Sequence, residues 1–303
     1  MSVEWFTWTN PVAVWWAFLV TVSGANIALW SSLRRRFQPR ASALGFGVAR
    51  INIMILLCAA YVFGCAFRSV LPRADVQRIV LFDTWLSSVF VGRSVATIAE
   101  VCFVIQWAIV LRYVGRMVKS DTVTNISTAI VPLILVAELC SWYAVITTNY
   151  LGNAIENSLW AVTFVLIAIA LFRLLYDFHG PVRVAVATMV AGIAFYVAFL
   201  IVVDVPMYLG RWHADVAGGK ELLGLFSGLY DVATRWTVTH DVARWRDEIP
   251  WMSLYFSAAV WSSLALCSFD LVKHHLPRYR RPLAIPGPAR QPFPVRVSSS
   301  GKL

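Results

Sequence analysis

Residues 95–111 read VATIAEVCFVIQWAIVL, an apolar run with a single acidic residue, Glu100, near its start. A helix rises 1.5 Å per residue, so about 20 such residues cross the roughly 30 Å hydrocarbon layer of a bilayer. The run lacks the alternating pattern of a barrel strand, and an open strand would leave its backbone polar groups unsatisfied in lipid. This stretch therefore predicts a membrane-spanning helix.

Six further runs have a similar length and apolar character, at residues 11–30, 51–71, 129–147, 159–175, 184–203 and 250–272. The composition agrees, because only 14% of the 303 residues are charged and 59% are hydrophobic. Soluble domains carry roughly a quarter charged residues, so this chain has too few to cover soluble surfaces. We expect an all-α, polytopic bundle of seven transmembrane helices over residues 1–276.

Lys and Arg are divided unevenly between the two sets of connecting segments, with 17 of the 26 following the first, third, fifth and seventh spans. The positive-inside rule makes that side cytoplasmic, with the N-terminus outside and the C-terminus inside. The net charge of +10 then serves topology and anionic headgroups, and no nucleic-acid partner is expected. Short loops and the absence of a basic leader favour a bacterial inner membrane, although a eukaryotic membrane stays open.

Three segments outside the spans carry their own patterns. Residues 72–92 are expected to form a helix lying in the outer interface or a short re-entrant piece. Residues 205–249 are long for a bare connection, and their apolar residues recur at helical spacing, which predicts an amphipathic outer cap lying on the bundle; these are Leu222, Phe226, Leu229, Ala233 and Trp236. Residues 277–303 mix Pro, Arg and Ser, so a disordered basic cytoplasmic tail is expected.

Acidic residues within the spans are costly in lipid and usually face the bundle interior. Those of this chain fall in the outer half of the predicted bundle, apart from Asp270 at the inner edge of the last span, and often have an aromatic residue one helical turn away. We therefore expect an outward-opening pocket with carboxylate and aromatic walls. The candidate catalytic residues are Glu138 and Glu100, and the candidate ligand-binding residues are Arg93, Trp142, Trp160, Asp204 and Tyr255.

Each of these residues also has a structural interpretation. Glu100 could pair with Arg93 or Arg68 as a link between helices, and Glu156 could complement a helix N-terminus. Aromatic residues near span ends could form an interfacial belt. A metal site has weak candidates in Glu100, Glu138, Asp204 and His240, but no ligand spacing supports it, so none is expected. No cofactor can be named.

Three classes of function fit this pattern. The first is a protein that binds or acts on a lipid-like or small hydrophobic ligand, with Glu138 and Glu100 as a general acid and a general base. The second is an accessory or sensing subunit of a membrane complex, and the third is a proton-coupled transporter. The expected partners are membrane lipids and, for the second class, another membrane protein or a further copy of the chain.

Overall fold

The computed structural model describes residues 5–41 and 47–272, and the side chains of residues 5–36 and 52–269. Seven of the described helices are long and apolar enough to cross a membrane, which confirms the helical bundle and indicates an integral membrane protein. The first five are α1 (Pro11–Ala41), α2 (Gly47–Val70), α3 (Val89–Met117), α4 (Asp121–Thr147) and α5 (Tyr150–Leu174). The predicted tail, residues 277–303, lies outside the described residues.

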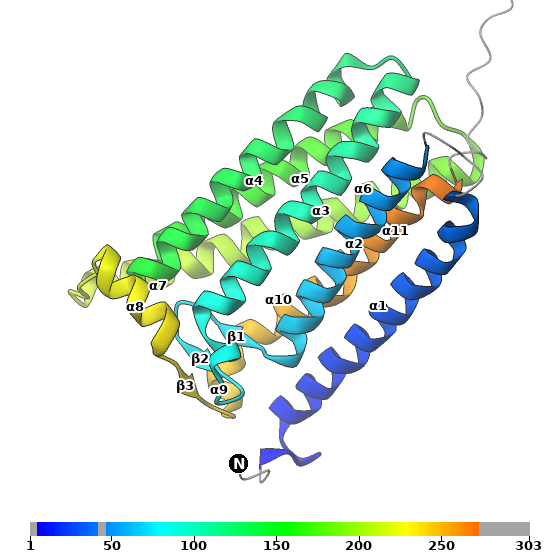
Figure 1. The fold of residues 1–303 in the computed structure, drawn as a ribbon. Coiled ribbons are helices and arrows are strands. Elements are labelled where there is room, and N and C mark those ends of the chain that lie inside the picture. The colour runs from blue at the N-terminus through cyan, green and yellow to red at the C-terminus, as the bar shows by residue number, and fades with distance from the viewer. Residues whose placement is uncertain (1–4, 42–46, 273–303) are drawn as a thin grey trace, which may run out of the picture.

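The last two spans are each built from several helical segments. The sixth joins α6 (Gly180–Phe199) to α7 (Val205–Ala217) through the π-helical turn η3 (Leu200–Asp204). The seventh joins α10 (Glu248–Leu254) to α11 (Val260–Val272) through a second π-helical turn, η4 (Tyr255–Ala259). In the bundle each of α1 to α5 packs on the next, α6 packs on α5, and α11 packs on α1, α2 and α3 (Figure 1).

Short turns join the helices tightly where small or capping residues permit it. The side chain of Ser120 accepts a hydrogen bond from the first turn of α4, and that of Asn149 accepts one from the first turn of α5. Gly152 lets α5 approach α4, because a Cβ atom there would lie 2.7 Å from the carbonyl oxygen of Cys140. These contacts fix the relative position of the two helices that carry Glu138 and Glu156.

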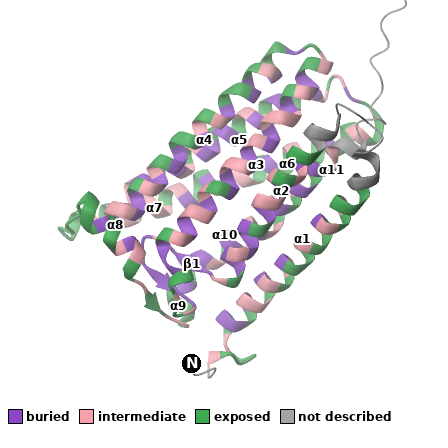
Figure 2. Ribbon diagram, viewed as in Figure 1, coloured by how far each residue is buried: buried purple, intermediate pink, exposed green. Residues whose placement is uncertain are grey.

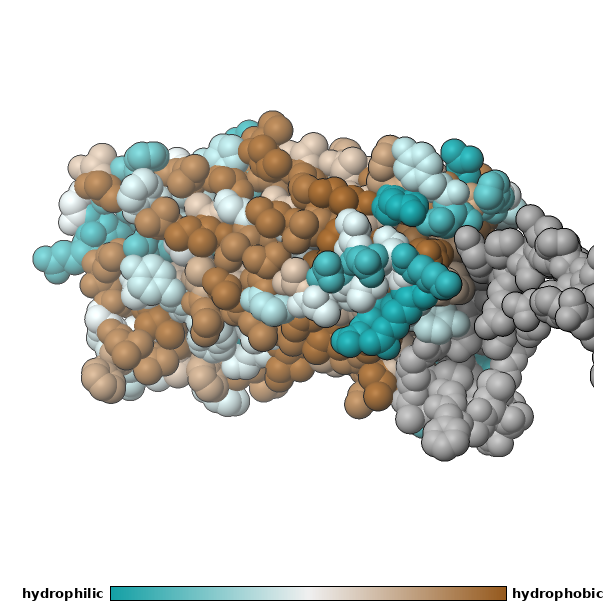
Figure 3. All heavy atoms as spheres, turned by 90° about the horizontal axis from the view of Figure 1, so that it is seen from above, coloured by the Kyte–Doolittle hydropathy of each residue, from teal (hydrophilic) through white to brown (hydrophobic). Residues whose placement is uncertain are grey.

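The outside of the bundle is apolar along its length, as a lipid-facing surface must be. Large apolar side chains such as Leu56, Ile98, Leu139 and Val202 are more than half exposed. Figure 3 shows hydrophobic side chains over the middle of one long face, with hydrophilic ones gathered toward the ends. Buried residues instead line the inner faces of the helices and the region around the short strands (Figure 2).

Residues 72–92, expected to form an interfacial helix or a short re-entrant piece, have a different structure from that helix. It forms a hairpin of β1 (Arg73–Ala74) and β2 (Ile79–Val80), followed by the 3-10 turn η2 (Trp85–Ser87) and the start of α3. Strand β3 (Thr237–Val238) pairs in parallel with β2. The helical expectation was wrong because the apolar residues of this segment are buried by tertiary pairing. We call this end of the bundle the sheet end.

Arg78 explains why the hairpin holds its shape. Its backbone is left-handed, with a φ of 57°, and its buried guanidinium donates to the carbonyl oxygen of Val145 at 2.5 Å and to Asp231 at 2.7 Å. Asp231 lies on α8 (Leu225–Thr234). Burial alone would raise the pKa of Asp231, but hydrogen bonds from Arg235 and Arg78 outweigh burial and hold that pKa below its ordinary value.

The structure also corrects the boundary of the sixth span. The sequence placed its end at Val203 and assigned residues 205–249 to a cap. Instead, the helix continues through η3 into α7 as far as Ala217. Pro206 does not end the helix. It lies in the first turn of α7, directly after the π-helical turn η3, and the first turn is where a helix tolerates a residue without a backbone N–H.

The remaining residues of the predicted cap contain α8, β3 and α9 (Val242–Trp245). The expected apolar face of α8 does not pack on the bundle, since Phe226 is 86% exposed. The buried residues of α8 are Gly228 and Val232. A Cβ atom at Gly228 would lie 2.1 Å from the carbonyl oxygen of Ile146, so close packing against α4 selects the small-residue face.

Candidate functional site

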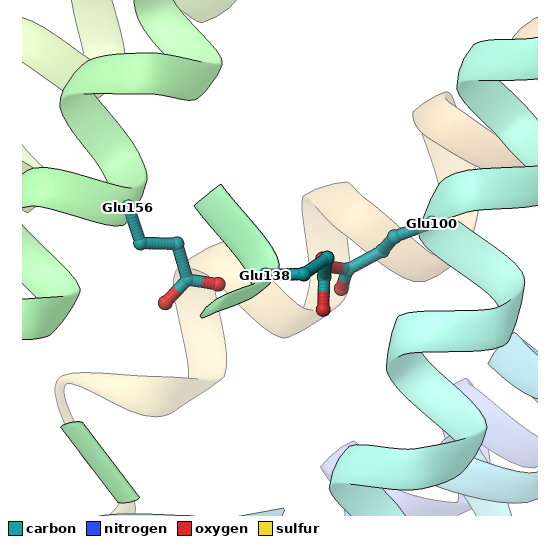
Figure 4. Close-up of side chains that lie close together, drawn as sticks. All are labelled: Glu100, Glu138 and Glu156. Atoms are coloured by element: carbon teal, nitrogen blue, oxygen red, sulfur yellow. The ribbon is translucent and has the colours of Figure 1, made fainter. Parts of the chain in front are cut away.

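Arg93 lies in the second turn of α3, with its buried guanidinium next to three carboxyl groups from three helices. One terminal nitrogen, Nη2, lies 2.9 Å from Glu100 Oε2 and 2.7 Å from Glu138 Oε2. The other, Nη1, lies 3.4 Å from Glu156 Oε1. Figure 4 shows the three acidic side chains reaching toward one another from α3, α4 and α5 (Figure 4). We call these four residues the arginine cluster.

Polar neighbours hold the carboxyl groups of the cluster in place. Tyr255 donates its hydroxyl proton to Glu100 Oε1 at 3.1 Å, and Asn153 donates to Glu156 Oε2 at 3.1 Å. The hydroxyl of Thr97 donates to Glu138 Oε2 at 2.5 Å and accepts a hydrogen bond from Trp142 Nε1 at 3.1 Å. Side chains from α3, α4, α5 and η4 therefore meet at one point.

The three carboxyl groups of the cluster could also be read as a metal site. One oxygen from each lies within 4.8 Å of the others, and an all-oxygen set would suit Mg²⁺ or Ca²⁺. However, the guanidinium of Arg93 already contacts all three groups and occupies the place that a cation would take. The cluster is therefore better described as an arginine held by three acids than as a metal site.

A polar pocket of about 90 Å³ lies between the arginine cluster and the hairpin at the sheet end. The cluster supplies part of its lining through Arg93, Glu100 and Glu156. Other lining groups come from the hairpin, from the sixth and seventh spans, and from neighbouring helices. They include Arg68, Asp75, Gln77, Asn153, Trp160, Tyr196, Asp204, Tyr208, Glu248, Trp251 and Tyr255.

An apolar chamber of about 270 Å³ lies between α5, α6 and the π-helical turn η4. Its walls come from Phe103, Trp107, Phe164, Met189 and Ile193, among others. Trp160, Tyr196 and Tyr255 line both this chamber and the polar pocket. These three aromatic residues therefore form a shared wall, with carboxyl groups on one side and hydrocarbon on the other.

The two π-helical turns supply two of the residues at this wall. Asp204 ends η3 on the sixth span, and Tyr255 begins η4 on the seventh. A π-helical turn inserts an extra residue into a helix and re-aims the side chains near it, and such turns are frequent at functional sites. The π-helical turns η3 and η4 therefore each place a polar side chain, Asp204 and Tyr255 respectively, at the polar pocket.

The structure distributes the candidate residues between two positions. Arg93, Glu100, Trp160, Asp204 and Tyr255 all line the polar pocket. Glu138 and Trp142 line neither the pocket nor the chamber, and instead lie behind Arg93, bonded through Thr97.

His240, a weak metal candidate, lies apart from these acids. Its Nε2 atom is 3.0 Å from the carbonyl oxygen of Leu81, and its ring stacks on Trp5. Neither His240 nor Asp204 belongs to the group of carboxyl oxygens that lie within 4.8 Å of one another. The acidic residue that joins Glu100 and Glu138 in space is Glu156, which the sequence favoured only as a helix-end group.

Sequence reasoning missed four polar lining residues: Asp75, Gln77, Asn153 and Asn157. Gln77 donates to Glu248 Oε1 at 2.9 Å, and Asp75 pairs with Arg68 at 3.5 Å. Both lie in the hairpin that was expected to be helical, so no pattern in the sequence placed them near the spans.

No family model, no curated protein and no solved structure matches this chain.

Proposed function

We propose that this chain is an integral membrane protein that binds a lipid-like amphiphile and acts on it by carboxylate acid/base chemistry. The observation that carries the proposal is the wall of Trp160, Tyr196 and Tyr255 shared by a charged pocket and an apolar chamber. A ligand with a polar head and a hydrocarbon tail matches both compartments at once. A wholly polar ligand would leave the chamber unfilled, and the side chains that line it would lose the packing contacts that a tail supplies.

The mouth of the chamber supports entry from the bilayer. Gly192 and Phe195 line the chamber and are also exposed on α6. That part of the outer surface is apolar, as expected for contact with lipid tails. A lipid could therefore slide its tail between α6 and η4 without crossing water.

The acid/base step is assigned to Glu100 and Tyr255, which touch each other and line the pocket. Glu100 can accept a proton from a bound head group while the hydroxyl of Tyr255 donates one to it, and Glu100 then returns its proton to the Tyr255 oxygen across the hydrogen bond that joins them. Glu138 does not reach the pocket, so its role is that of a positioning residue: it holds Arg93, and Arg93 holds Glu100.

The same features favour ligand binding over proton-coupled transport. The apolar chamber, on the other side of the shared wall from the polar pocket, is lined by apolar and aromatic side chains, with Ser262 as its one aliphatic hydroxyl. A proton path toward the other end of the bundle would need a chain of polar groups.

The unequal distribution of Lys and Arg supports a sheet end that faces outward and an inward C-terminus. Short loops between the spans are the ground for assigning the chain to a bacterial plasma membrane.

A chamber-filling variant tests the proposal. A Cβ atom at Gly192 would meet no other atom within 4 Å, so Gly192→Leu should fold while its side chain enters the chamber. Gly24→Leu is the matched control, because Gly24 has equal space on α1 and lines neither cavity. Both changes replace a helical Gly by a better helix former. We expect lipid extraction and mass spectrometry of purified protein to show a copurified amphiphile in wild type and Gly24→Leu, reduced at least tenfold in Gly192→Leu.

The chemical step needs a second measurement. Wild type and Glu100→Gln, in nanodiscs containing lipid extract from the native membrane, should be compared by mass spectrometry over time. Wild type is expected to convert one lipid species, whereas Glu100→Gln should retain the bound amphiphile without converting it. Equal lipid content in Gly192→Leu and wild type would overturn the binding proposal, and equal conversion by Glu100→Gln would overturn the acid/base role.

A further inference from the structure

We infer that the ligand carries a cationic group, an ammonium, which binds against Asp204 inside the polar pocket. The inference rests on the proposed function for the apolar part of the ligand and adds the chemistry of its head group. Three independent observations support it: the balance of charge around the pocket, the lack of a partner for Asp204, and the aromatic rings around it.

The charge balance of the pocket is negative. Five carboxyl groups line it, whereas only two guanidinium groups do, those of Arg68 and Arg93. Counting Arg211, which contacts Glu248 from outside the lining, still leaves five acids against three bases. An anionic head group would meet like charges in a region of low dielectric constant, and such a juxtaposition is unfavourable. A cation would restore the balance.

Four of the five carboxyl groups already have basic partners. The pairs are Asp75 with Arg68, Glu100 with Arg93, Glu156 with Arg93, and Glu248 with Arg211. Asp204 differs, because within residues 5–36 and 52–269 no side chain forms a hydrogen bond or an ion pair with it. It is nevertheless only 9% exposed. A buried carboxyl group without a partner is costly, and a bound ammonium would supply the missing partner.

Aromatic rings complete the environment that an ammonium prefers. Tyr196, Tyr208, Trp160, Trp251 and Tyr255 all line the pocket. Ring faces attract cations, and ammonium ligands are commonly bound by such groups of rings together with a carboxylate. The face of the Tyr208 ring already receives a cation in this structure, the guanidinium of Arg211, 5.7 Å from its centre. Tyr196 joins this pocket to the chamber, so an ammonium beside it would have its tail on the apolar side.

Equilibrium binding to the full chain in nanodiscs tests the inference, with empty nanodiscs subtracted. The probes are decyltrimethylammonium, which has both head and tail, 1-decanol, which lacks the charge, and tetramethylammonium, which lacks the tail. The variant Asp204→Asn keeps the size of the side chain and removes its charge. Asp177→Asn is the matched control. Asp177 lies beyond the end of α5 and pairs with Arg173 of that helix, and neither residue lines the pocket.

We expect Asp204→Asn to weaken binding of decyltrimethylammonium at least tenfold, with 1-decanol unchanged and Asp177→Asn like wild type. Gly192→Leu should weaken binding of both tailed probes, and tetramethylammonium should bind far more weakly than its decyl counterpart. If 1-decanol binds as tightly as decyltrimethylammonium, or if Asp204→Asn leaves the latter unchanged, the cationic head group is refuted while the amphiphile proposal stands. If tetramethylammonium binds as tightly as its decyl counterpart, or Gly192→Leu has no effect, the amphiphile proposal fails instead.

Discussion

Removing Arg93 should destabilise this protein more than removing any one of its acidic partners. Arg93→Met keeps much of the side-chain volume but leaves Glu100, Glu138 and Glu156 buried together without a counter-charge. Removing one partner of a buried ion pair costs about 3–5 kcal/mol. For a large domain each kcal/mol shifts the melting temperature by about 2–4 °C, so the expected loss is about 6–20 °C.

The partner variants make the test quantitative. Glu138→Gln retains an oxygen that can accept the hydrogen bonds of Arg93 and Thr97, and it lowers the acid excess by one. We expect its melting temperature to stay within about 2 °C of wild type. The double variant Arg93→Met/Glu138→Gln should be more stable than Arg93→Met by about 1–3 kcal/mol, because residues in one ion-pair network are coupled.

Thermal unfolding in detergent, followed by intrinsic fluorescence, provides the measurement. Arg173→Met is the matched control: Arg173 pairs with Asp177 but is 44% exposed, and exposed pairs contribute about 0–1 kcal/mol. The reasoning would be refuted if Arg93→Met melted within about 2 °C of wild type. It would also be refuted if the double variant were no more stable than Arg93→Met, because the cluster would then not be an electrostatic unit.

Three further predictions follow from the fold. Gly152→Leu should reduce the free energy of unfolding by at least about 2 kcal/mol, because its side chain would be forced into the backbone of α4, whereas Gly24→Leu should unfold like wild type. The pKa of Asp231 is lowered in the folded chain, so the stability it contributes is present at neutral pH and lost as pH falls below the unfolded value of about 4. The protection of residues 225–234 against hydrogen exchange, expressed relative to the intrinsic exchange rate at each pH, should then decrease at acid pH in wild type, and Asp231→Asn should show that lower protection already at pH 7. For orientation, the native cysteines are replaced and single thiols are placed at the exposed positions Glu221 and Thr122. An impermeant reagent added to intact cells should label position 221 and should reach position 122 only after permeabilisation, and the reverse pattern would invert the assigned topology.

The sequence alone was sufficient to predict the seven-helix bundle. A run such as 95–111 has only one stable form in lipid, because its backbone must bond to itself. The cost of burying acids in lipid also singled out Glu100, Glu138 and Asp204. Helical spacing placed Arg93 and Glu100, seven residues apart, on one face, and in the structure Arg93 Nη2 lies 2.9 Å from Glu100 Oε2. These conclusions depend on composition and local periodicity, which are properties of single segments.

The tertiary structure decided which of these groups share a site. Glu156 joins the cluster, and Glu138 lies behind Arg93, because the approach of α4 to α5 is set by contacts such as Gly152, which no periodicity encodes. The hairpin at 72–92 is paired by β3 from residues 237–238, and this long-range contact overrides the local helical pattern. The helical periodicity likewise did not predict the π-helical turns at Asp204 and Tyr255. The aim of a side chain into a cavity depends on how the helices pack, and packing is a property of the whole chain.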